Sequence, residues 1–102
     1  MHSDRVIADT IKAAQRLLWH RYDLPDAMKV VRLRKLVRSP TVQSALQRSS
    51  DTLLPSTLRA VELVIADQLT DREMIRRVWH ILNNPNLIQA VGPPNSPFGG
   101  WH

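Results

Sequence analysis

Residues 70–85 read TDREMIRRVWHILNNP, and they define one helix and the start of the next. Thr70 and Glu73 have the spacing of a capping box, in which a threonine hydroxyl accepts a hydrogen bond from the glutamate amide at a helix start. Apolar residues then recur every three or four positions, as on one face of a helix. These residues are Met74, Ile75, Val78, Ile81 and Leu82. Pro85 has no N–H group, so it ends this helix and suits the first position of the next one.

The same kind of helix start recurs along most of the chain. Four of the seven prolines fall on one 15-residue grid, and Thr70 occupies its vacant position. These prolines are Pro25, Pro40, Pro55 and Pro85. Because proline favours the first position of a helix and is excluded from helix interiors, the grid predicts short helices that begin at these five positions. Ahead of the grid, a helix is predicted from Ser3 or Asp4 to about Tyr22, with Tyr22 on its inward face.

The predicted fold is all-α, a compact bundle of five or six short helices in one domain of residues 1–92. A chain of 102 residues with 43% hydrophobic residues is long enough and apolar enough for one small core. Residues 93–102 are rich in proline and glycine, so we expect a flexible C-terminal tail. Phe98 and Trp101 in this tail suit a docking motif, and they would equally suit a tail that folds back over its own core.

An internal repeat is also indicated. A shift of 45 residues places Asp26 on Asp71, Pro40 on Pro85, and the apolar pair 36–37 on the pair 81–82. The shared pattern is a helix, two polar residues, a proline and a second short apolar helix, which predicts two pseudo-symmetric helical repeats. Amphipathic helices that begin at prolines also align with one another without any duplication, so this explanation stays open.

The charge distribution points to a binding function. The chain carries a formal net charge of +5, which favours an acidic partner. Between Ala27 and Ser50 there are six cations and no Asp or Glu, and two apolar residues lie among them on the predicted outer face. The candidate partner-binding residues are Met28, Lys29, Val31, Arg32, Arg34, Lys35 and Arg38. The leading hypothesis is therefore a non-enzymatic regulatory or adaptor protein that binds a protein with an acidic surface; a merely solvated basic face is the alternative interpretation.

A second functional hypothesis places the active surface elsewhere. Residues 57–82 resemble a helix-turn-helix, the motif whose second helix enters the major groove of DNA. This resemblance implies a nucleic-acid-binding transcriptional regulator, with Arg72, Arg76 and Arg77 contacting bases or phosphates. Asp67, Asp71 and Glu73 depart from the expected pattern, because they put negative charge where phosphate would approach.

Other functional classes find little support in the sequence. There are no cysteines, and no nucleophile, phosphate-loop or metal-ligand spacing stands out, so we expect no enzyme, cofactor or metal site. The pairs at 19–20, 79–80 and 101–102 are all Trp-His, which we interpret as tryptophans at the core boundary beside polar neighbours. No apolar run is long enough for a membrane span, so a cytoplasmic protein is expected. A homodimer stays open.

Overall fold

The computed structural model describes residues 2–50 and 52–92. These residues form six helices and no strand, which confirms the predicted all-α bundle. The helices are α1 (His2–His20), α2 (Asp26–Val37), α3 (Pro40–Gln47), α4 (Leu53–Ala66), α5 (Asp71–Leu82) and α6 (Pro85–Val91). The predicted tail of residues 93–102, with its proposed docking motif, lies outside the described residues.

The grid prolines mark the starts of α2, α3, α4 and α6, but they do not occupy one fixed position relative to the helix. Pro40 and Pro85 are the first residues of α3 and α6, whereas Pro25 lies just before α2. Pro55 is the third residue of α4, so this helix begins two residues earlier than predicted. The first amides of a helix have no acceptor within the helix, and therefore a residue without an N–H is tolerated throughout the first turn.

The end of α1 also differs from the prediction. The helix stops at His20, and Tyr22, expected on its inward face, is 86% exposed. The chain turns immediately after the helix, and the amide of Leu24 donates to the carbonyl of Arg21 at 3.3 Å. Because Pro25 pushes the residue before it towards an extended conformation, the helix has to end before that point.

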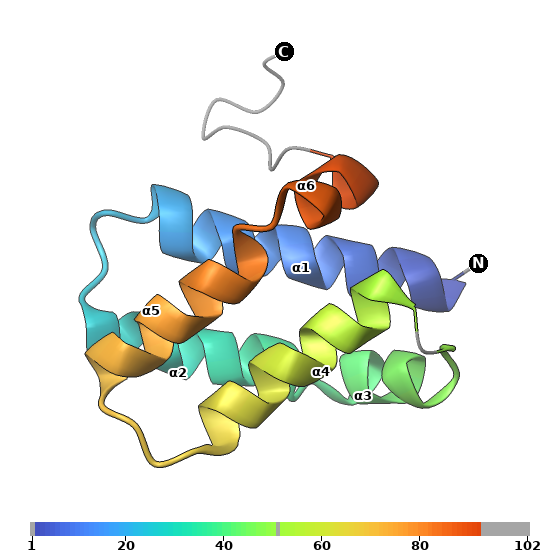
Figure 1. Ribbon diagram of the computed structural model, residues 1–102. Coiled ribbons are helices and arrows are strands. Elements are labelled where there is room, and N and C mark those ends of the chain that lie inside the picture. Colours follow the sequence, from blue (N-terminus) through green and yellow to red (C-terminus); the bar gives the residue numbers. More distant parts are fainter. Residues whose placement is uncertain (1, 51, 93–102) are drawn as a thin grey trace.

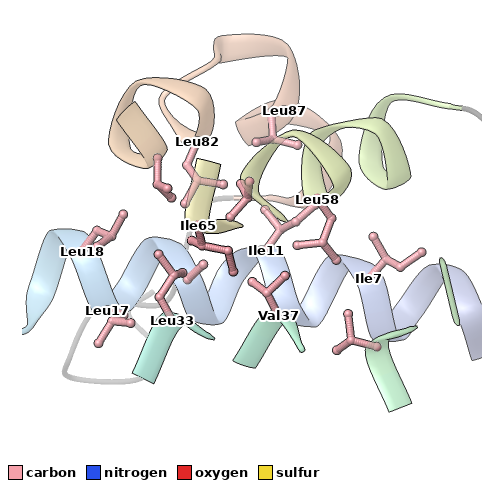
Figure 2. Packing of buried hydrophobic residues seen from close by; sticks show 14 of the residues in the cluster. Ile7, Ile11, Leu17, Leu18, Leu33, Val37, Leu58, Ile65, Leu82 and Leu87 are labelled. Carbon is pink, nitrogen blue, oxygen red and sulfur yellow. The ribbon is translucent and has the colours of Figure 1, made fainter. Parts of the chain in front are cut away.

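The helices pack in two layers around one core. Figure 1 shows α1 and α2 running side by side, with α4 and α5 crossing them obliquely. The short helices α3 and α6 both contact α1. Figure 2 shows Leu33 and Val37 of α2 on one side of α1, and Leu58, Leu82 and Leu87 on the other. The long first helix therefore contributes buried residues to the core from Ile7 to Leu18.

The helix boundaries recur at the 45-residue shift of the predicted repeat. Both α2 and α5 have 12 residues, they begin 45 residues apart, and two residues separate each from a short helix that begins with proline. Equivalent positions are buried in both halves, as in the pairs Leu33 and Val78, and Val37 and Leu82. Helices α1 and α2 each contact both α4 and α5. The symmetry stops at the short helices, since both of them pack on α1.

Glutamine side chains anchor the ends of the two equivalent helices. Gln15 of α1 is fully buried, and its Nε2 donates to the carbonyl of Leu82 at the end of α5, at 3.3 Å. Gln43 of α3 donates through Nε2 to the carbonyl of Val37 at the end of α2, at 3.0 Å. The last carbonyls of a helix lack partners within the helix, so these bonds satisfy groups that burial would otherwise penalise.

Candidate partner-binding face on α2

Helix α2 separates a buried side from a cationic side. Val30, Leu33 and Val37 are buried against the rest of the bundle, with at most 2% of their surface exposed. On the opposite side, residues spaced by three or four positions form one exposed stripe, as helical periodicity requires. We call this stripe the α2 face, and it consists of Met28, Val31, Arg32, Lys35 and Arg38.

Two of the seven residues predicted for partner binding lie on the flanks of this stripe. Lys29 is half-buried, near the boundary with the core. Arg34 turns towards α4, where its Nη2 donates to the carbonyl of Ile65 at 3.4 Å, beside the C-terminal end of that helix. A cation at this place is favourable because the C-terminal end of a helix carries partial negative charge. Arg34 therefore has a role in holding α2 against α4.

The α2 face combines exposed apolar surface with uncompensated charge. Met28 and Val31 are each 45% exposed, although both are apolar. Within the described part of the chain, Arg32, Lys35 and Arg38 form no ion pair. An apolar patch surrounded by unpaired cations can bury hydrophobic surface against a partner and attract carboxylates at the same time.

The loop before α2 carries a carboxylate, Asp23, and another arginine already engages it. Arg21 donates to both carboxylate oxygens of Asp23, at 3.0 and 2.9 Å. This hydrogen bonding is the main reason why the pKa of Asp23 falls to about 2. The charge of Arg32 lowers the same pKa further, so Arg32 lies close to this pair without bonding to it. Asp23 therefore stays ionised and holds Arg21 in place at the edge of the α2 face.

The arginines of the helix-turn-helix hypothesis lie on α5, and all three are exposed. Helices α4 and α5 pack against each other across the turn of residues 67–70, as the motif requires. Glu73 pairs with two of the arginines: its carboxylate lies 3.0 Å from Nε of Arg77 and 3.7 Å from Nη1 of Arg76. Arg72 forms no such pair in the described part of the chain. Much of the positive charge on this surface is therefore compensated within α5 itself.

The structure brings together two tryptophans that the sequence analysis treated separately. Trp19 of α1 and Trp79 of α5 meet edge to face, with their ring centroids 6.4 Å apart and an interplanar angle of 65°. Trp79 is 36% exposed, at the predicted core boundary, and the ring of His80 lies against it at 5.4 Å. The contact depends on the packing of α1 against α5, so no local sequence signal predicts it. The third Trp-His pair lies outside the described residues.

A hollow beside the α2 face is not predicted by the sequence pattern. Arg16 and His20, which the helical pattern assigns to the outer side of α1, line it together with Arg32 of α2. The spacing of four between the two α1 residues places them on one face, which was the only available signal. Their approach to Arg32 depends on how α1 packs against α2.

The described residues contain no cluster of three or more side chains suited to hold a metal ion. None of the helices described has the length and apolar character needed to cross a membrane. Comparisons with known protein families, with curated proteins and with solved structures found no match to this chain. The arguments about function therefore depend on the geometry and charge of the surfaces above.

Proposed function

We propose that this chain is a non-enzymatic regulatory or adaptor protein that binds an acidic surface of another protein through the α2 face. The observation that carries the proposal is the exposed stripe in which Met28 and Val31 lie among Arg32, Lys35 and Arg38. Like charges this close repel one another and lower stability, and no carboxylate in the described residues pairs with them. A binding function explains why such a surface is present.

The composition of the α2 face suits a protein partner. Methionine is flexible and polarisable, so it adapts to an apolar surface on the other side of an interface. Cations around an apolar centre increase the rate of encounter with an acidic partner and reject basic ones. Burial of the exposed parts of Met28 and Val31 would then contribute the apolar part of the binding free energy.

The alternative, a nucleic-acid-binding helix-turn-helix, has weaker support. Its surface on α5 contains Arg72, Arg76 and Arg77, but Glu73 pairs with the last two. A carboxylate at the start of the recognition helix repels phosphate, which supplies most of the affinity in DNA binding. The α2 face contains no carboxylate, and its two apolar residues have no partner on a phosphate backbone.

The experiment compares two double variants that make the same change in charge on different helices. Arg32→Glu with Lys35→Glu reverses charge on the α2 face, and Arg72→Glu with Arg76→Glu does so on α5. Partners captured with the wild-type protein are identified, purified and measured by titration calorimetry against all three proteins. We expect the α2 variant to lose binding and to keep its helical circular dichroism, with an unchanged or slightly raised midpoint of thermal unfolding. The α5 variant should bind like the wild type.

The same variants test the nucleic-acid alternative. Affinity for duplex DNA is measured over a series of salt concentrations, where its logarithm should fall with a slope of about −0.9 per phosphate neutralised. Salt-dependent binding that only the α5 variant loses would favour the helix-turn-helix. If the α2 variant and the wild type recover the protein partner equally, the α2 face is only a solvated surface with no role in binding.

A further inference from the structure

Between α1 and α2 lies a hollow of about 340 Å³, which falls within the size range of small-ligand sites. Its apolar lining comes from Ala13 and Leu17 of α1 and Leu36 of α2. Leu17 is buried, and Ala13 and Leu36 are half-buried, so these three form the floor. Figure 2 shows Leu17 on the side of α1 that faces α2. The deeper part of the hollow is therefore hydrophobic.

The charged residues that line the hollow are all basic. Arg16 and His20 reach it from α1, and Arg32 reaches it from α2. Arg32 is exposed and Arg16 is half-buried, so their charged groups lie nearer to solvent than the floor does. Neither arginine forms an ion pair within the described part of the chain. Two arginines that form no ion pair in the described residues therefore line the hollow, one from each helix.

A third arginine at the hollow is already compensated. Arg21 lines it as well, but its guanidinium is bonded to both carboxylate oxygens of Asp23. The net positive charge at the opening therefore comes chiefly from Arg16 and Arg32. A guanidinium offers a planar set of donors that matches a carboxylate or a phosphate, so these two residues are suited to an anionic group.

A depression of mixed polar and apolar lining adjoins the hollow. This shallower depression shares Arg32 and Leu36 with the hollow and extends along α1 towards α3. Val6 of α1 and Val42 of α3 line that extension together with polar residues, and Asp9 adds a carboxylate to it. A ligand whose charged group lies between Arg16 and Arg32 would therefore find its apolar contacts on the floor of the hollow itself.

We propose that the α1–α2 hollow binds a free amphipathic organic anion, with a carboxylate or phosphate between Arg16 and Arg32 and an apolar body over Leu17 and Leu36. The hollow is too small for a folded partner, and its basic opening above an apolar floor matches a molecule with one charged end. The site does not depend on the proposed protein partner, because most of its lining belongs to α1. Only Arg32 belongs to both surfaces.

Decanoate is the probe, and decanol and decyltrimethylammonium are the controls, because all three carry the same alkyl chain. Calorimetry gives the stoichiometry and affinity, and amide chemical shifts in ¹⁵N-labelled protein locate the site. We expect saturable binding of one decanoate per chain, with the largest shifts within residues 13–20 and 32–36. Decanol should bind at least about tenfold more weakly, because it cannot form charge-assisted hydrogen bonds with the two arginines. The cationic probe should not bind.

Variants then separate a defined site from general attraction to a basic protein. Arg16→Gln should weaken decanoate binding by about tenfold, whereas Arg38→Gln removes the same charge outside the hollow and should leave the affinity unchanged. Ala13→Phe should block the hollow without any change in charge and should abolish binding, with folding checked by circular dichroism. Arg16→Gln should also leave protein-partner binding intact, which distinguishes this site from the α2 face.

Three results would overturn the proposal. One is the absence of saturable decanoate binding at millimolar concentration. Another is an equal loss of affinity in Arg16→Gln and Arg38→Gln, which would mean that the probe responds only to net charge. Retained binding in a correctly folded Ala13→Phe variant would likewise place the probe somewhere other than the hollow.

Discussion

Thr70 determines where α5 begins, through a single side-chain hydrogen bond. Its Oγ1 accepts from the amide of Glu73 at 3.2 Å. The other half of the predicted capping box is replaced, since the Glu73 carboxylate accepts a hydrogen bond from Arg77 at 3.0 Å. Thr70→Ala should therefore lower the free energy of unfolding by about 1 kcal/mol, the usual cost of a lost N-cap. Chemical denaturation measures this, and Thr70→Ser, which keeps the hydroxyl, should stay close to the wild type.

For single residues, the sequence predicts contacts between positions close in the chain, but it does not predict contacts between distant positions. The cap at Thr70 involves residues three positions apart, so it follows from the local pattern. The full burial of Gln15 does not, because its hydrogen-bond acceptor lies 67 residues away, at Leu82. Tyr22 was misplaced because the apolar period continues past the point where the turn before Pro25 ends the helix.

The leucines of helix α4 differ strongly in exposed fraction, depending on which side of the helix they occupy. Leu58 is fully buried, whereas Leu63 is 75% exposed on the same helix. Leu58→Ala should reduce the free energy of unfolding by roughly 2–5 kcal/mol, because it removes apolar contacts and leaves a cavity. Leu63→Ala is the matched control and should change it by no more than about 0.5 kcal/mol. Equal effects in urea denaturation would mean that α4 presents a different side to the core.

For the candidate surfaces, the sequence predicts those features that depend on a single helix. Helical periodicity groups Met28, Val31 and Lys35 on one stripe, and the structure places them together. Helical periodicity does not predict the hydrogen bond from Arg34 to the end of α4, because this contact depends on how two helices pack. The hollow lined by Arg16 was missed for the same reason, since it exists only where α1 and α2 meet.

On the scale of the whole molecule, the two repeat-like halves interlock. Helices α1 and α2 of the first half each contact α4 and α5 of the second, and α6 contacts α1. Figure 2 shows this arrangement, since side chains from both halves surround Ile11 of α1. The core is therefore shared between the halves, although the helix boundaries repeat. The sequence predicts the repeat from its proline spacing, but it contains no local signal for how the halves pack.

This shared core predicts that neither half folds alone. In residues 1–50, the side chains of Leu33 and Val37, which are fully buried in the whole chain, would lose the covering helices α4 and α5. A chain of about 50 residues buries too small a fraction of its surface to offset this loss. We expect that fragment to show little helix by circular dichroism, and residues 51–102 to behave likewise. An equimolar mixture should regain helical signal, because each fragment supplies the apolar surface that the other lacks. A cooperative thermal transition in residues 1–50 alone would contradict the shared core and would make the first half an independent unit.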